Sequence, residues 1–170
     1  MGVIQNSINQ ALGTVAAAGI GIKHVKEQEA ANVISTTREA VVAEEQANTA
    51  KTEAREAEHN WYDWDDKLGA SPAGELSYLK EARIPDLDKK KAKADEKVLK
   101  SGTFKDAKKA AEIAKDLSAA KMAARALEIK QEAITDLKTR AINRRELANT
   151  LTNIADTKKA KYEKKWGGNL

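Results

Sequence analysis

Residues 33–68 read VISTTREAVVAEEQANTAKTEAREAEHNWYDWDDKL, and the expected fold class follows from this stretch. It lacks Gly and Pro, and small or apolar side chains return along it at alternating steps of three and four residues. Such steps place the side chains on one face of an α-helix and are typical of a coiled-coil seam. The seam consists of Val33, Thr36, Ala40, Ala43, Ala47, Ala50, Ala54, Ala57, Trp61, Trp64 and Leu68. Because alanines bury little area, we expect the aromatic cluster of Trp61, Tyr62 and Trp64 to anchor the seam.

A second long helix is expected within residues 103–170. Residues 104–165 contain neither Gly nor Pro, and Gly167 and Gly168 follow as a stop signal. Thr103 and Asp106 resemble the capping box that opens a helix. The inner face also includes Gln131. The phase of the stripe slips from Ile134 to Leu137, which is expected to disturb a supercoil locally. The large apolar members of this stripe are Ile113, Leu117, Leu127, Ile134, Leu137 and Leu151.

Residues 69–102 are expected to connect the two long helices through short ones. Ser71 is a predicted N-cap, and Pro72 occupies the first position of a short helix that runs to about residue 82. Pro85 is expected to break the helix. A further short helix then begins at about residue 86 and ends at Ser101-Gly102.

The composition favours the same fold class. Of 170 residues, 33% are charged, 31 are Ala and two are Pro, whereas only 31 are Leu, Ile, Val or Phe. This balance is typical of long helices. We therefore predict an all-α protein, an elongated helical hairpin or coiled-coil-like bundle with two long helices. Its parts are an uncharged amphipathic helix at 1–22, the Ala-seam helix at 23–68, the connection at 69–102, and a long helix with a basic tail at 103–170.

Residues 1–22 carry no charged side chain and end in an apolar run of 12 residues. The run is too short to span a membrane, for which about 20 residues are needed. It also lacks the preceding basic residues of a signal peptide, so we expect no secretion by that route. An amphipathic helix here would dock on the protein's own helices, on a neighbouring copy, or on a membrane surface. The residues expected to dock are Val3, Ile4, Ile8, Leu12 and Val15.

Charge is unevenly distributed along the chain. Residues 23–66 hold 5 basic and 11 acidic side chains, whereas residues 138–166 hold 9 basic and 3 acidic ones. In an antiparallel hairpin these segments would attract each other. The densest basic tracts would alternatively contact phosphates of nucleic acid without sequence specificity. Their candidate phosphate-binding residues are Lys89, Lys90, Lys91, Lys158, Lys159, Lys161, Lys164 and Lys165.

The sequence offers little that would support catalysis. There is no Cys, and His24 and His59 are too far apart in sequence to share a helical face as metal ligands. The acidic residues Asp63, Asp65 and Asp66 lack the Gly and closing Glu of an EF-hand. No nucleotide-binding or hydrolase motif occurs. We therefore expect no enzymatic activity, no cofactor and no metal site.

The layout of the whole chain resembles internal virion proteins of bacteriophages, including ejected or DNA-pilot proteins. The likeness lies in the uncharged start from MGVI to GIGI at 1–22, the Ala-rich charged helices, and the basic end KKWGG at 164–168. It implies a non-enzymatic structural or assembly protein that associates with itself or with other virion proteins through helices. The implied location is the virion or the host cytoplasm. The alternatives are a membrane-active or ejected protein that works through residues 1–22, and a non-specific nucleic-acid-binding protein.

Overall fold

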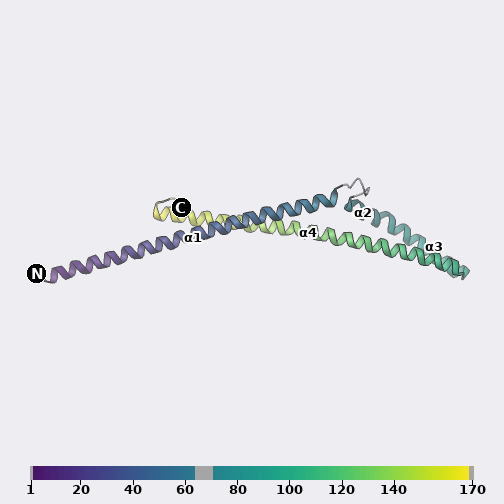
Figure 1. Cartoon of the computed structure of the whole chain (residues 1–170), viewed down its shortest axis with the longest axis horizontal. Coiled ribbons are helices and arrows are strands. Elements are labelled where there is room, and N and C mark those ends of the chain that lie inside the picture. Colours follow the sequence, from purple (N-terminus) through teal and green to yellow (C-terminus); the bar gives the residue numbers. More distant parts are fainter. Residues whose placement is uncertain (1, 64–70, 169–170) are drawn as a thin grey trace. The chain divides into compact units, whose positions relative to one another are not determined.

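The computed structural model describes the backbone of residues 2–63 and 71–168, and the side chains of those residues from Gly19 onward. The described chain contains helices and no strand, in the order α1 (Gly2–Tyr62), α2 (Pro72–Tyr78), η1 (Leu79–Arg83), α3 (Ile84–Ser101) and α4 (Phe104–Trp166). Figure 1 shows α1 and α4 as two long helices. The all-α prediction is confirmed, and so are the expected bounds of the last helix.

Helix α1 ends at Tyr62, six residues before the expected end at Leu68. The expectation was wrong because it followed the apolar spacing and ignored the acidic run that starts at Asp63. Carboxylates at a helix C-terminus oppose the helix dipole, so this run favours an early end. The Asp63 N–H still donates to the His59 carbonyl at 2.7 Å, which closes the last turn. Trp64 lies outside the described residues, as does Leu68.

The chain divides into two compact units, and both long helices contribute to each. Unit 1 comprises the residues up to Thr49 and those from Ile142 onward. Within it, α1 and α4 run antiparallel, because Glu29 contacts Lys165 whereas Glu44, further along α1, contacts Arg145, which precedes Lys165 in α4. This is the predicted helical hairpin, with the acidic first helix against the basic last one.

Unit 2 comprises residues Ala50–Ala141. Here α3 turns back onto α4 through Gly102, whose φ of 62° is left-handed and suits a residue without Cβ. Ion pairs between the two helices run from Lys97–Asp106 beside the turn to Lys121–Asp88 further away, so α3 and α4 are also antiparallel. The predicted stop at Ser101-Gly102 is confirmed.

The connecting segment differs from the prediction at Pro85. The segment is helical without interruption from Pro72 to Ser101, and the Pro85 break is therefore wrong. One π-helical turn, η1, lies directly before the proline, and there the Ile84 N–H donates to the Leu79 carbonyl five residues back. Buried or partly buried residues of this segment also step by five from Leu79 to Ile84. The π turn absorbs that step and relieves the clash that Pro would make in an α-helix.

The core of unit 2 is built around Trp61. Its ring is buried with leucines of α2, η1, α3 and α4, and Ile84 and Ile134 pack against the cluster as partly buried residues. Aromatic and leucine side chains bury far more apolar area than alanine. The buried members of this core are Trp61, Leu76, Leu79, Leu87, Leu117, Ala120, Ala124 and Leu127.

We predict that Trp61→Ala destabilises the protein by about 3–5 kcal/mol, the range for removing a large buried aromatic side chain. Urea denaturation followed by far-UV circular dichroism would measure this change. The neighbouring Tyr62 is exposed, so its predicted part in the anchor was wrong, and it serves as the matched control. Its replacement by Ala is expected to change stability by less than about 0.5 kcal/mol. Equal effects of the two substitutions would contradict the placement of Trp61 in the core.

Candidate functional site

The predicted seam of α1 faces inward for most of its length. Thr36 is its buried polar member, and its hydroxyl donates to the Asn32 carbonyl at 2.9 Å and accepts a hydrogen bond from Lys158 at 2.8 Å. Ala57 is half-buried. The buried apolar members are Val33, Ala40, Ala43, Ala47, Ala50, Ala54 and Trp61.

The stripe of α4 is less uniform. Leu117 and Leu127 are buried, and Gln131 is exposed, so its assignment to the inner face was wrong. An exposed amide at this position keeps its hydrogen bonds to water, which burial would remove. The half-buried members are Ile113, Ile134, Leu137 and Leu151. The stripe also continues to Tyr162 and Trp166, which are buried and half-buried, and their three- and four-residue spacing from Ala155 and Lys158 is the signal that we missed.

The most deeply buried residues of unit 1 lie where alanines of the two helices meet. Ala47 is 1% exposed and Ala148 is 0% exposed, and they form one cluster with Ala43 and the partly buried Leu151. Methyl groups at these positions let the helix backbones approach closely. The cluster leaves no room for a longer side chain without a shift of one helix.

We predict that Ala148→Leu destabilises unit 1 by about 1–3 kcal/mol through overpacking. Ala160 lies on the same helix and is exposed, so Ala160→Leu is the control and should change stability by less than about 0.5 kcal/mol. Thermal unfolding followed by circular dichroism would compare them. Unfolding of Ala148→Leu at the temperature of the unsubstituted protein would mean that the two helices are not tightly apposed there.

Polar contacts accompany the seam of unit 1. Glu29 accepts hydrogen bonds of 2.6 Å from both Lys165 and the Trp166 indole, and these bonds lower the pKa of Glu29. Arg145 pairs with Glu44 and donates to the Asn48 amide oxygen at 2.9 Å. Exposed ion pairs contribute little stability each, but they select orientation and register.

The structure divides the predicted phosphate-binding lysines into two groups. Some are engaged within the chain: Lys90 with Asp86, Lys91 with Asp95, Lys158 with Asn32 and Thr36, and Lys165 with Glu29. Lys165 also lies 4.8 Å from the centre of the Trp166 ring. The others make no ion pair with the described residues and are exposed; these are Lys89, Lys159, Lys161 and Lys164.

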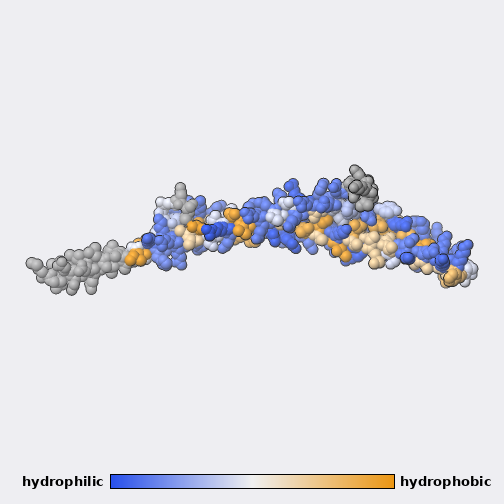
Figure 2. Space-filling view, viewed as in Figure 1, coloured by the Kyte–Doolittle hydropathy of each residue, from blue (hydrophilic) through white to orange (hydrophobic). Residues whose placement is uncertain are grey.

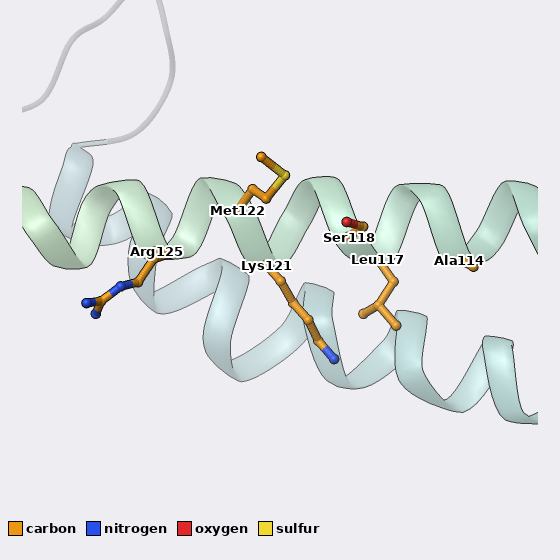
Figure 3. Close-up of a pocket in the computed structure, with 6 residues that line it drawn as sticks. All are labelled: Ala114, Leu117, Ser118, Lys121, Met122 and Arg125. Atoms are coloured by element: carbon orange, nitrogen blue, oxygen red, sulfur yellow. The ribbon is translucent and has the colours of Figure 1, made fainter.

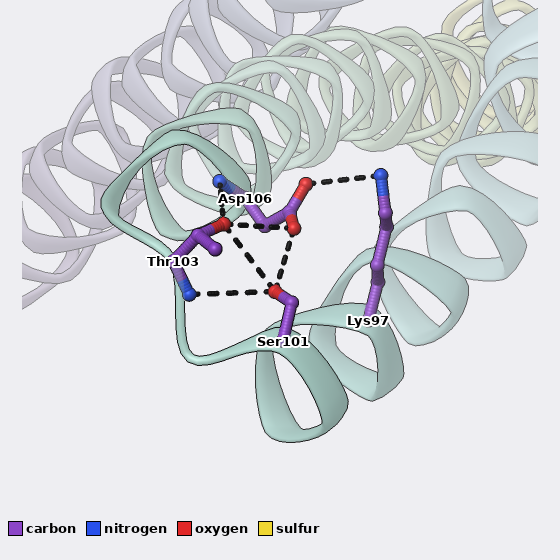
Figure 4. Close-up of polar contacts among 4 residues, drawn as sticks. All are labelled: Lys97, Ser101, Thr103 and Asp106. Carbon is purple, nitrogen blue, oxygen red and sulfur yellow. Dashed lines mark hydrogen bonds and ion pairs between the residues drawn. The ribbon is translucent and has the colours of Figure 1, made fainter.

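The turn between α3 and α4 is closed by a polar network around Asp106 (Figure 4). The Asp106 carboxylate accepts hydrogen bonds from the hydroxyls of Ser101 at 2.6 Å and Thr103 at 2.9 Å, and it pairs with Lys97 at 3.0 Å. The Asp106 N–H donates to the Thr103 hydroxyl, which is the predicted half of the capping box. In a complete capping box the Asp106 carboxylate would also accept a hydrogen bond from the Thr103 N–H. Here the Thr103 N–H donates to the Ser101 hydroxyl, and the short Asp106 side chain accepts from hydroxyl groups.

This network predicts a specific pH dependence. Hydrogen bonds from Ser101, Lys97 and Thr103 lower the pKa of Asp106 from 3.8 to about 2. A lowered pKa means that the folded state favours the charged carboxylate, so the stabilisation is complete above about pH 4 and is lost as the pH falls toward 2. Asp106→Asn should therefore flatten the fall in melting temperature over that interval. Calorimetry at a series of pH values would test this, and parallel curves for both proteins would contradict it.

The described surface offers only shallow concavities. One is lined on α4 by Leu117, Lys121 and Arg125, and Figure 3 shows Leu117 directed toward α3 and Met122 directed away from it. Within residues 2–63 and 71–168, no cluster of acidic or histidine side chains is arranged to hold a metal ion. No helix among the residues that could be searched is long and apolar enough to cross a membrane.

Helix α1 continues beyond the point where its partner ends. Trp166, the last residue of α4, contacts Glu29, and residues 19–28 of α1 are all exposed. Ile22 and Val25 precede Glu29 and Val33 at the spacing of the seam, and they are 57% and 43% exposed. The inward face of α1 therefore extends past the hairpin as an uncovered surface. The five predicted docking residues lie nearer the N-terminus of α1, and their side chains are not among those that the structure describes: Val3, Ile4, Ile8, Leu12 and Val15.

Comparison with protein-family models, with curated proteins and with solved structures finds no match for this chain.

Proposed function

We propose that the protein is a non-enzymatic helical assembly protein, an internal or accessory component of a bacteriophage particle. The observation that carries the proposal is the uncovered inward face of α1 at Ile22 and Val25. In unit 1 the same face is covered by α4 as far as Glu29, and the face then continues without a partner in the described chain. A helix face of this kind is suited to another helix.

The particle context is supported by the sequence layout and by the charge of the helices. Long charged helices with an uncharged amphipathic start resemble internal virion proteins, and this likeness implies assembly through helices. The shallow surface of the described chain also suits a protein that acts by association.

Nucleic-acid binding through the lysine tracts has weaker support. Lys90, Lys91, Lys158 and Lys165 already contact side chains within the chain, and a phosphate would have to displace those contacts. Affinity for nucleic acid depends on the number of phosphates that are neutralised, so fewer free lysines mean weaker binding.

We predict that the intact protein self-associates and that Ile22→Ser with Val25→Ser raises its dissociation constant at least about ten-fold, because two apolar side chains leave the contact. Multi-angle light scattering over a range of concentrations would measure this. Ile20 is the matched control, since it is also exposed but lies on the opposite face of α1. Ile20→Ser should leave the association almost unchanged.

Two results would contradict the proposal. A monomeric intact protein at all concentrations would show that the uncovered face does not join copies of this chain. If Ile20→Ser raised the dissociation constant as much as Ile22→Ser with Val25→Ser, α1 would associate without using the inward face. If the intact protein is monomeric and binds lipid vesicles through residues 1–22, the membrane-active alternative replaces the assembly role.

A further inference from the structure

The turn between α3 and α4 carries the two most exposed large apolar side chains of the described residues. Leu99 is 86% exposed and Phe104 is 85% exposed, and they stand on either side of the turn. Phe104 is also the only phenylalanine of the chain. Exposing both side chains to water costs free energy, and burying them in an apolar environment would regain that free energy. We call Leu99, Phe104 and the turn between them the hairpin tip.

The hairpin tip is held in a defined conformation. Gly102 takes the left-handed conformation and its N–H donates to the Val98 carbonyl, while Ser101 and Thr103 bind the Asp106 carboxylate (Figure 4). Because the turn is capped in this way, the two apolar side chains are presented by helix ends and not by a mobile loop. Less conformational entropy is lost when such a surface is bound.

Basic side chains surround the hairpin tip. Residues 96–109 hold five lysines and two acidic residues, a net charge of +3, and two of the lysines are engaged, Lys97 with Asp106 and Lys100 with Glu96. Lys105, Lys108 and Lys109 are exposed and make no ion pair with the described residues. In the space-filling view, hydrophobic and strongly hydrophilic residues lie side by side at this end of α3 and α4 (Figure 2).

A groove of about 440 Å³ lies directly behind the hairpin tip, between α3 and α4. It is lined by the apolar side chains of Ala94 and Ile113, by Asp106 with its partner Lys97, and by three further lysines, Lys90, Lys93 and Lys109. Lys109 is five residues from Phe104, which is about 8 Å along a helix. A helix that lies in the membrane interface buries its apolar side chains about 5–10 Å deep, and insertion of Phe104 to a similar depth would place Lys109 at the level of the lipid headgroups.

We propose that the hairpin tip is a membrane-contact site, which inserts Leu99 and Phe104 into the surface of an anionic bilayer while the lysines behind it bind lipid phosphates. The site is separate from residues 1–22 and from the uncovered face of α1, and it does not depend on the assembly role. The apolar residues of the hairpin tip account for the insertion, and the lysines behind the tip account for the preference for anionic lipid.

A lipid surface explains these features better than nucleic acid or a protein partner. Nucleic acid would use the lysines but would leave the two exposed apolar side chains in water. A protein partner would have to supply an apolar pocket ringed by acidic residues, and α1, the most acidic helix of this chain, uses Glu29, Glu44 and Glu58 to pair with α4. An anionic bilayer offers an apolar interior for Leu99 and Phe104 and phosphate groups for the lysines.

The test uses vesicles of phosphatidylcholine with phosphatidylglycerol, and vesicles of phosphatidylcholine alone. The intact protein should bind the anionic vesicles in a flotation assay, and binding should weaken as salt is raised, because the lysine contribution is screened. Leu99→Ser with Phe104→Ser should lower the partition coefficient at least about ten-fold. Met122→Ser with Ile129→Ser is the matched control, since these residues are also exposed and apolar but lie away from the turn. The control should bind like the unsubstituted protein.

The absence of cysteine allows a second readout that assigns the contact to the hairpin tip. Phe104→Cys or Met122→Cys, labelled with an environment-sensitive fluorophore, reports on one position each. The label at 104 should shift to the blue with anionic vesicles and be quenched by nitroxide lipids, whereas the label at 122 should not respond. Duplex DNA at the same phosphate concentration should cause no blue shift at either position.

Four outcomes would overturn the proposal. One is the absence of binding to anionic vesicles. The second is binding with an unresponsive label at 104, which would assign the contact to another part of the chain. A response of equal size with neutral vesicles would remove the role of the lysines. Finally, a lower oligomeric mass of Leu99→Ser with Phe104→Ser in the absence of lipid would show that the tip contacts protein.

Discussion

In unit 1, α1 and α4 meet at a small cluster of alanines, with the partly buried Leu151 packed against it. Ala47 and Ala148 are almost completely buried, yet together they remove little apolar area from water. Other groups must therefore hold the helices in register. Glu29 with Lys165 and Trp166, and Glu44 with Arg145, provide this along the same pair of helices. In unit 2 the same limitation does not apply, because Trp61 and the leucines of four helical elements form a larger core.

Both proposals concern places where a helix pair stops covering apolar surface. The inward face of α1 continues past Trp166 with Ile22 and Val25 uncovered, and the turn between α3 and α4 exposes Leu99 and Phe104. The two surfaces differ in charge. Ile22 ends the uncharged segment 1–22, and Lys23 and Lys26 flank Val25, whereas the turn lies among five lysines at 96–109 and suits an anionic surface. A protein with both surfaces could assemble with itself and still contact lipid.

Local signals predicted much of the fold. The Ser71 cap, the Gly102 stop and the bounds of α4 followed from residues that act within one helical turn. The inward stripe of α1 followed from its spacing. The partner of each stripe could not be predicted in this way. The phase change in the stripe of α4 predicted a local disturbance and no change of partner, but Leu117 lies in a core with α3, whereas Ala148 packs against α1. Spacing shows that a face is apolar and leaves open which helix covers it.

The helix at Pro85 and the hairpin tip show two further limits. Proline is a strong breaker in an α-helix, and only the step of five from Leu79 to Ile84 indicated a π turn that tolerates it. The hairpin tip went unnoticed because Leu99 and Phe104 belong to no stripe. A large apolar side chain outside every helical stripe points to an interaction site when it is exposed, and spacing alone does not show its exposure.

The order of helices along the chain also has a kinetic consequence. The pairing of α3 with α4 closes short loops, as between Lys121 and Asp88, which are 33 residues apart, whereas Lys165 and Glu29 are 136 residues apart. Loop closure costs more entropy for the longer separation, and contacts between near neighbours in sequence form faster. We expect the α3–α4 hairpin to fold first and α1 to dock last on a preformed α4.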